Sequence, residues 1–271
     1  QMQLASIYLQ RNNTDQAYGI YRQILTAHPD AADAWKGLIA ALQASDHGAQ
    51  ALQQLAYIPT PVRQKLNADP EFEATLASLY AAENDTAHAS YYMARVQQHF
   101  AQLHQLPPAG LAIQNAWLLY NTKNERALYS ALMQLGGRAD LTPAQRETVQ
   151  TIWANWAVQR AGAALDNNDN NRAVDILESA AAAFPDNLQV RKVLAGGYLK
   201  VGQTKEALAI YKNIPMDDAS ALDMQGAIGA ALAANDRVQA EVWLRQALQR
   251  FPNNAGILGM AARFEQARGD K

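Results

Sequence analysis

Five histidines are the side chains in this chain best suited to hold a metal ion. They are His28, His47, His88, His99 and His104. None of them forms an HExxH motif or joins a carboxylate at a spacing that suits zinc. The chain has no cysteine, which excludes disulfides, thiol catalysis and cysteine-bound zinc. We therefore expect solvated histidines and no metal site.

A second candidate metal site lies at Asp166, Asn168 and Asn170, which match the opening of a calcium-binding loop. Asn171 replaces the glycine that such a loop needs, and Leu177 stands in place of its final glutamate. The segment is therefore predicted to be a turn between two helices.

Glycine pairs and singlets could cradle a phosphate if they followed a strand. Gly196, Gly197, Gly226 and Gly229 instead lie inside helical patterns, so they are predicted to allow close helix packing. No Ser-His-Asp set and no pair of catalytic carboxylates emerges from the sequence. The chain is not expected to be an enzyme, and no cofactor is implied.

Two tryptophans could stack on the faces of sugar rings. Trp153 and Trp156 are three residues apart on the apolar face of a predicted helix, together with Val149 and Ile152. That position favours packing in the core or between repeats, and sugar stacking is the alternative.

One short pattern repeats along the chain and predicts the helices that position these side chains. It consists of a small residue, then a bulky apolar residue, then a second small or apolar residue. Its central alanines, Ala173, Ala207 and Ala240, are 34 and 33 residues apart. A period in this range is typical of stacked helix pairs. The small residues allow two helices to approach closely, while larger apolar residues fill the space beside them.

The residue types at this period resemble the tetratricopeptide repeat (TPR) family across nearly the whole chain. The resemblance is carried by Trp35, Leu38, Leu42 and Ala51, by Ala195, Tyr198, Gly202, Ala207 and Tyr211, and by Ala240, Ala247 and Pro252. It implies an all-α solenoid of helix-turn-helix repeats, interrupted by irregular or unpaired helices. In that family the first helices line a groove that binds a partner.

Aligning the repeats by their alanines places eight polar residues on positions that face the groove. We predict that these residues bind the partner. The alternative is that they are ordinary solvated surface residues. They are Lys36, Gln43, Asn155, Gln189, Lys192, Lys200, Gln225 and Arg263. The family's clamp for a C-terminal carboxylate is not expected. Ala40 and Gly196 occupy its asparagine places and Met260 occupies an arginine place.

The breaks in the period predict the domain organisation. An N-terminal block at 1–135 holds a clipped first repeat, repeats near 32–56 and 70–103 and a degenerate pair at 109–135, with a short helix inserted between Tyr57 and Asp69. A linker at 136–142 ends in a capping box at Thr142. The C-terminal block, 143–271, begins with a long helix at 143–165, which either extends a first helix or is unpaired. Regular repeats to 254 and a half repeat to 271 follow. Both ends suggest a section of a longer array.

Composition narrows the classes of partner. The chain is 49% hydrophobic and 18% charged, with a net charge of −2. Its basic residues are scattered, so nucleic acid is not an expected partner. No stretch approaches the roughly 20 apolar residues of a membrane span, so this segment is not expected to contact a membrane.

A narrower resemblance concerns three segments, at 136–142, 195–198 and 261–270. They are similar to the TPR region of the bacterial cellulose synthase operon protein C family. This resemblance implies a periplasmic scaffold that binds protein partners of a cellulose or exopolysaccharide synthesis and export complex. Two alternatives stay open: a groove that binds polysaccharide and guides glucan to an outer-membrane pore, and a TPR regulatory region of a larger enzyme.

Overall fold

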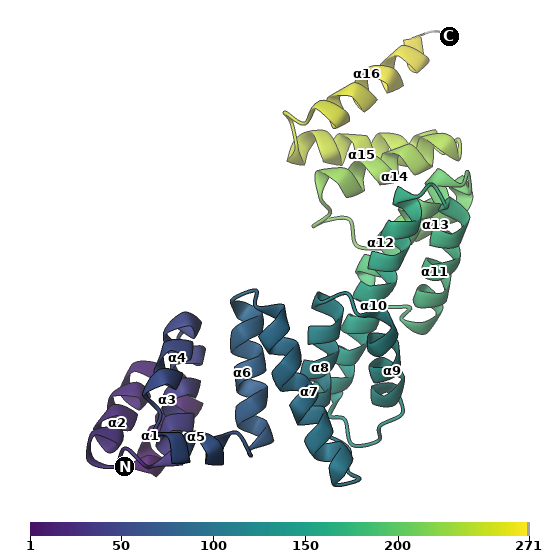
Figure 1. Cartoon of the computed structure of the whole chain (residues 1–271). Coiled ribbons are helices and arrows are strands. Elements are labelled where there is room, and N and C mark those ends of the chain that lie inside the picture. The colour runs from purple at the N-terminus through teal and green to yellow at the C-terminus, as the bar shows by residue number, and fades with distance from the viewer. Residues whose placement is uncertain (270–271) are drawn as a thin grey trace. The chain divides into compact units, whose positions relative to one another are not determined.

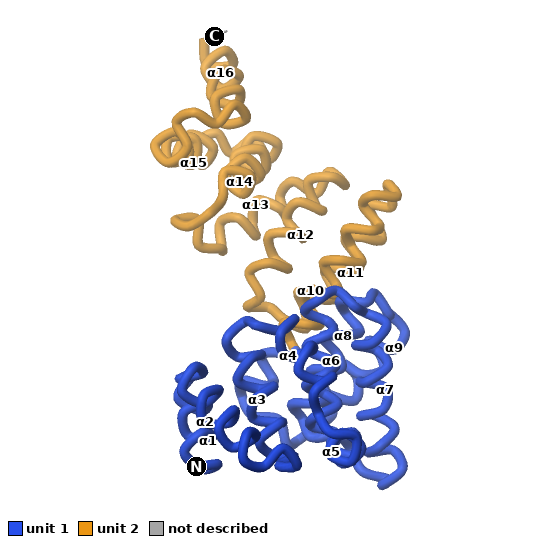
Figure 2. The backbone as a smooth tube through the Cα atoms, turned by 60° about the vertical axis from the view of Figure 1, so that its left-hand side comes forward, with its two compact units in different colours: residues 1–149 blue, residues 150–271 orange. Residues whose placement is uncertain are grey.

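The structure is a computed structural model that describes residues 1–269, where every regular element is a helix (Figure 1). The predicted all-α array of helix hairpins is confirmed. The chain divides into two compact units, residues 1–149 (unit 1) and 150–271 (unit 2), coloured blue and orange in Figure 2. Asp270, which belongs to the predicted half repeat, and Lys271 lie outside the described residues. Within residues 1–269 no helix combines the length and the apolar character needed to cross a membrane.

Unit 1 consists of consecutive helices that pack mainly against their neighbours in the chain. They are α1 Met2–Gln10, α2 Thr14–Ala27, α3 Ala32–Ala44, α4 Gly48–Gln54, the 3-10 turn η1 Leu55–Tyr57, α5 Thr60–Leu66, α6 Pro70–Ala82, α7 Thr86–Gln102, α8 Ala109–Asn121 and α9 Glu125–Gly136. The first helices of its hairpins are α1, α3, α6 and α8. The short helix predicted between the second and third hairpins is α5.

Unit 2 has the same pattern of neighbour packing and a more regular repeat. Its helices are α11 Asn170–Ala183, α12 Leu188–Lys200, α13 Thr204–Lys212, α14 Ala221–Ala233, α15 Arg237–Arg250 and α16 Ala255–Gly269, preceded by α10 Pro143–Asp166, which contributes residues to both units. The helix predicted after Thr142 begins at Pro143. Its capping box is present: Gln145 N donates to Thr142 Oγ1 at 3.2 Å, and Thr142 N donates to Gln145 Oε1 at 3.0 Å. The predicted linker at 136–142 and the two-block division stay predictions.

Each hairpin turn uses one residue in the left-handed region, followed by the cap of the next helix. Seven turns share this geometry, with positive φ at Asn12, Asp46, Asn84, Lys123, Asn168, Gly202 and Asn235. In each, the amide after that residue donates to a carbonyl five residues back, as Asp236 N does to Ala231 O at 2.8 Å. Asparagine, aspartate and glycine dominate because they tolerate this backbone conformation best. The predicted turn at Asp166–Asn170 is one of the seven.

The repeated alanines lie in the hydrophobic core of unit 2. Ala173, Ala207 and Ala240 are each fully buried, with no exposed surface. A larger side chain has no room there, because interiors are packed about as densely as organic crystals. The sequence pattern therefore marks helix contacts correctly.

The prediction that the glycines serve close packing is right at some positions and wrong at others. A Cβ on Gly226 would lie 2.4 Å from Tyr211 Oη, and one on Gly197 would lie 3.3 Å from Val174 Cγ2. A Cβ on Gly196 would meet nothing within 4 Å. Gly229 is in ordinary contact range only, with Met260 Cε at 3.8 Å. Adjacent glycines on a helix point about 100° apart, so only one of the pair faces the neighbouring helix.

One predicted cap is also wrong. Thr60 and Asp69 each precede a proline, and this pattern predicts an N-cap followed by a first-turn proline. Asp69 caps α6 as predicted, because its side chain accepts from Glu71 N at 3.0 Å. At α5 the cap residue is Pro59, and Thr60 is already helical. Pro61 is tolerated at the second helical position, since the first four amides of a helix have no partner within it.

Candidate functional site

Two of the three predicted groove lysines connect the first helices of consecutive repeats. Lys36 Nζ on α3 lies 2.5 Å from Asp69 Oδ2, at the start of α6, and 3.8 Å from Glu71 Oε2. In unit 2, Lys192 Nζ on α12 lies 2.8 Å from Asp223 Oδ2 in the first turn of α14. A carboxylate at a helix N-terminus is favourable for the dipole, and the lysine adds a charge-assisted hydrogen bond.

These pairs hold their carboxylates in the ionised form. Partial burial raises the pKa of Asp69 and of Asp223, but hydrogen bonds outweigh that effect and bring each pKa below its ordinary value of 3.8. The donors are Lys36 and the backbone of Glu71 for Asp69, and Lys192 and Ser220 for Asp223. Both lysines are therefore engaged within the protein.

Gln225 makes the equivalent contact one repeat further along. Its Nε2 donates to Asn254 Oδ1 at 3.1 Å, and the same oxygen accepts from Ile257 N at 3.1 Å to cap α16. Three of the eight predicted groove residues thus connect first helices to each other.

The other predicted groove residues are mostly exposed. Gln43, Gln189, Lys200 and Arg263 present their side chains to solvent, and Asn155 is half-buried. Their partner-binding role stays a prediction.

The two tryptophans lie together on α10 and are largely covered. Their ring centroids are 5.4 Å apart, and Arg160 Cζ lies 5.0 Å from the centre of the Trp156 ring. Trp156 is only 6% exposed and Trp153 is half-buried. Burial at this level agrees with the packing role that the sequence favours. Sugar stacking by these rings stays an untested alternative, with little of the Trp156 face open to a sugar.

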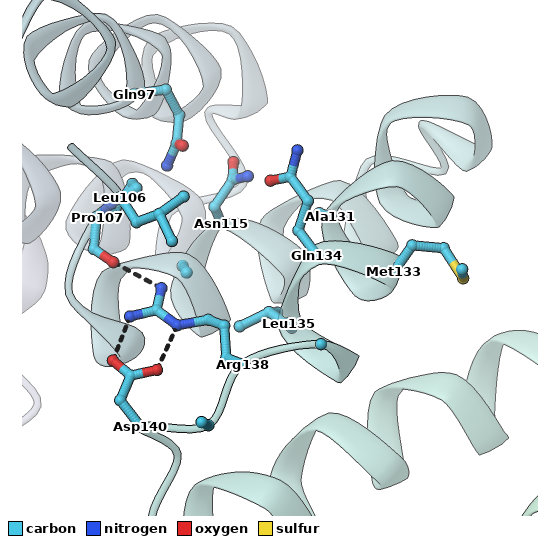
Figure 3. Close-up of a pocket in the computed structure, with 13 residues that line it drawn as sticks. Gln97, Leu106, Pro107, Asn115, Ala131, Met133, Gln134, Leu135, Arg138 and Asp140 are labelled. Atoms are coloured by element: carbon cyan, nitrogen blue, oxygen red, sulfur yellow. Dashed lines mark hydrogen bonds and ion pairs between the residues drawn. The ribbon is translucent and has the colours of Figure 1, made fainter. Parts of the chain in front are cut away.

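A hollow of about 570 Å³ lies elsewhere in unit 1, among α7, α8, α9 and the loop at 137–140 (Figure 3). We call it the α7–α9 hollow. Three side-chain amides line it, from Gln97 on α7, Asn115 on α8 and Gln134 on α9. Figure 3 shows these amides on one side of the hollow and Arg138 on the other. Leu106 contributes exposed aliphatic surface, whereas Leu135, which also lines the hollow, is only 1% exposed.

Arg138 holds the loop side of this hollow in place. Its Nε and Nη2 donate to the two carboxylate oxygens of Asp140 at 2.8 and 2.6 Å, and its Nη1 donates to Pro107 O at 2.7 Å. The bond from Arg138 lowers the pKa of Asp140, and in return raises the pKa of Arg138. The fork to Asp140 braces the 137–140 loop internally, and the bond to Pro107 O ties it to the loop that joins α7 and α8.

A smaller hollow of about 160 Å³ lies between the first helices α6 and α8. Gln114 Nε2 on α8 donates to Ala74 O and to Ser78 Oγ on α6, both at 2.6 Å. Trp117 and Asn121 lie at its edge. Gln114 and Asn115 are neighbours in sequence but line different hollows. Gln114 lines the smaller hollow beside the first helix α6, and Asn115 lines the α7–α9 hollow beside the second helices α7 and α9.

Sequence reasoning missed the α7–α9 hollow entirely. Its residues lie in three helices and two loops spread over residues 97–140. Residues 137–140 belong to the segment at 136–142 that carries the narrower resemblance, but no sequence pattern connects them to the lining residues of the helices. The expected absence of a metal site has no structural test, but no group of three or more metal-binding side chains occurs in residues 1–269. The only available signal was compositional, since uncharged amides recur on successive helices.

Comparison with protein families identifies the repeats. Models described as tetratricopeptide repeat match residues 164–230 and 1–41. The chain carries tetratricopeptide repeats. The TPR fold is in general an interaction scaffold, and the TPR architecture predicted from the alanine period is confirmed.

Two curated relatives share part of this TPR array. The chain is 27% identical over 201 residues, or 74% of its length, to a cellulose synthase operon protein C of Pseudomonas fluorescens strain SBW25. It is 27% identical over 165 residues, or 61% of its length, to the protein of the same name from Xanthomonas axonopodis pv. citri strain 306. The aligned segments span 15% and 10% of those relatives. The narrower resemblance seen in the sequence is thereby supported.

Solved TPR structures agree with the fold. The C-terminal part of a TPR repeat-containing protein from Cytophaga hutchinsonii superposes with a TM-score of 0.66, at 11% identity, covering 96% of this chain and 99% of that one. A TPR protein from Parabacteroides merdae gives a TM-score of 0.53 at 11% identity, with 97% of each chain covered. At these identities the likeness concerns the fold alone.

Proposed function

We propose that this chain is a non-catalytic TPR scaffold that binds protein partners in a bacterial cellulose or exopolysaccharide synthesis and export complex. The observation that carries the proposal is its 27% identity, over 74% of its length, to a cellulose synthase operon protein C. The periplasm is the compartment we expect for such a scaffold. Because the aligned segment is 15% of that relative, the proposal concerns this segment's role within a larger protein.

The physical support comes from contacts that fix each first helix to the next. Lys192 with Asp223 and Gln225 with Asn254 join three successive first helices of unit 2. A surface that is already ordered loses less conformational entropy when a partner binds, so more of the contact energy appears as affinity. These contacts suit a docking platform.

The test is direct binding between purified proteins. The chain would be immobilised and exposed, one at a time, to purified periplasmic portions of proteins encoded beside a cellulose synthase operon protein C. We expect saturable binding of at least one of them. The control is the Cytophaga hutchinsonii TPR fragment, which shares the fold at 11% identity and should not bind. Failure of every operon protein to bind, or equal binding by the control, would contradict the proposal.

Direct glucan binding by the groove is the alternative that the sequence leaves open. Titration with soluble cello-oligosaccharides, followed by tryptophan fluorescence and by mobility in glucan-containing gels, separates it from protein binding. A saturable change in both readouts, without binding of any operon protein, would favour the glucan groove.

A further inference from the structure

We infer that the α7–α9 hollow is a peptide-binding site that takes an extended, uncharged segment of a partner protein with an aliphatic side chain. This inference rests on the proposed function, in which the chain binds protein partners. It deepens that function by assigning a surface and the chemistry of the occupant. That surface lies outside the predicted groove.

The hollow lies on the second-helix side of unit 1. Its lining comes from α7, α8, α9 and two loops, with no residue from α3 or α6. The first-helix groove next to it is partly closed by Gln114, which bonds to Ala74 O and Ser78 Oγ across α8 and α6. The larger of these two hollows is therefore lined mainly by the second helices α7 and α9 and lies outside the groove predicted from the repeats.

The three amides supply the chemistry that an extended backbone needs. An extended segment carries unpaired N–H and C=O groups, and a primary amide can donate to one and accept from the other. Within the described residues, the side chains of Asn115 and Gln134 make no hydrogen bond. Gln97 has only a weak contact from Nε2 to Met93 Sδ at 3.9 Å, which leaves its carbonyl oxygen open. Donors and acceptors are thus available from three helices on one side of the hollow.

The aliphatic surface and the charge balance define the rest of the occupant. Leu106 lines the hollow and is 67% exposed, so it offers an apolar surface that an aliphatic side chain of an occupant can cover. The charge of Arg138 is balanced by Asp140, and a further N–H of Arg138 donates to Pro107 O, so the hollow offers no unpaired charge. An uncharged segment with an aliphatic side chain matches both features.

A glucan matches the hollow less well. Sugar rings are bound in proteins largely through stacking on aromatic faces, and none of the lining residues is aromatic. A volume of about 570 Å³ lies within the range of pockets that hold a few peptide residues. The Arg138 fork keeps the loop wall ordered before binding, which reduces the entropy that binding costs.

The test uses the whole chain and defined probes. The probe peptide is acetyl-Ser-Leu-Asn-Leu-Ser-amide, with a copy methylated on the backbone nitrogens as a control and cellopentaose as the glucan probe. The chain has six methionines, of which Met133 lines the hollow and is 55% exposed. With ¹³C-methyl methionine labelling, we expect the peptide to shift the Met133 signal saturably. The fully buried Met224, in unit 2, serves as the internal reference.

Substitutions then locate the binding energy. A lost amide hydrogen bond of about 0.5–1.5 kcal/mol corresponds to roughly a 2- to 10-fold weaker affinity. We expect Asn115→Leu and Gln134→Ala each to weaken peptide binding by that factor, and the pair by about 10-fold or more. Gln98→Ala, on the exposed residue next to Gln97, should bind as the wild type does. Gln134 is exposed, so its variant should fold even if Asn115→Leu does not.

The outcomes separate this inference from the proposed function. Unchanged affinity in Gln134→Ala and Gln97→Ala, equal binding of the methylated peptide, or a Met133 shift with cellopentaose alone would overturn the inference. If an operon protein binds the chain and these variants leave that binding intact, the scaffold function stands and the hollow is not its docking surface. If no operon protein binds, the function fails whatever the peptide does.

Discussion

Lys192 and Asp223 join two consecutive repeats of unit 2, with Lys192 Nζ 2.8 Å from Asp223 Oδ2. The same step in unit 1 joins Lys36 to Asp69 at 2.5 Å. In both cases a lysine of one first helix reaches a carboxylate in the first turn of the next. The contact is part of how the repeats stack, as well as a feature of the surface that a partner would meet.

Breaking this contact should destabilise unit 2 modestly. Lys192→Met keeps the length of the side chain and removes the charge. Since both side chains are about four-fifths buried, with 19% and 23% exposed, we expect a loss of about 1–2 kcal/mol. Chemical denaturation followed by circular dichroism measures it. Lys205→Met, at an exposed position on α13, is the control and should change stability by less than about 0.5 kcal/mol. Equal effects of the two variants would contradict the role given to Lys192.

The Lys192–Asp223 contact also predicts a pH dependence. The pKa of Asp223 is lower in the folded chain than its ordinary value, so its contribution is complete above the unfolded pKa of about 3.9. It is lost as the pH falls through the folded pKa. We expect wild type to exceed Asp223→Asn in free energy of unfolding by a constant amount near neutral pH. That difference should shrink below about pH 4. A difference that grows on acidification would have the wrong sign.

Two glycines of neighbouring repeats should respond oppositely to alanine. Gly226→Ala places a Cβ 2.4 Å from Tyr211 Oη, and Tyr211 is only 4% exposed, so we expect about 1–3 kcal/mol of destabilisation. Gly196→Ala meets nothing within 4 Å on a helix and should stabilise by about 0.4–1 kcal/mol. Thermal unfolding of both variants checks the pair. Stabilisation by Gly226→Ala would show that Tyr211 moves aside freely.

Glu73 is the one buried charged residue in the described part of the chain, at 4% exposed, and Arg95 Nε donates to its carboxylate. Arg95→Met leaves that carboxylate without its cation, and we expect about 2–3 kcal/mol of destabilisation, because an uncompensated buried charge costs more than the pair gains. The double variant Glu73→Leu/Arg95→Met should recover most of the loss. Additive losses in the double-mutant cycle would contradict this account.

Arg138→Ala should loosen the loop wall of the α7–α9 hollow without unfolding unit 1. The substitution removes the fork to Asp140 and the bond to Pro107 O. We expect faster amide hydrogen exchange at Gln105 and Leu106 and at 137–141, with α8 little changed, since local openings cost less than global unfolding. Arg126→Ala, on an exposed residue of α9, is the control and should leave both loops unchanged. Unchanged exchange in Arg138→Ala would show that the fork does not order them.

By itself the sequence determined the repeat and its local geometry. The alanine period, the turn residues and the caps are properties of short segments, because close helix contacts need small residues and left-handed turns need asparagine, aspartate or glycine. Ala173, Ala207 and Ala240 are buried as that pattern requires. Local signals were ambiguous at two positions. The residue at which α5 begins made Thr60 helical instead of a cap, and the direction of the neighbouring helix left Gly196 without a close contact.

Only the tertiary structure decided what the polar residues do. Lys36, Lys192 and Gln225 have partners 33, 31 and 29 residues away, and their roles follow from how one repeat is stacked on the next. The α7–α9 hollow likewise depends on where three helices and two loops end. Neither is encoded by a spacing, since residues that meet across repeats are related by the packing angle of helices and not by a fixed separation in the chain.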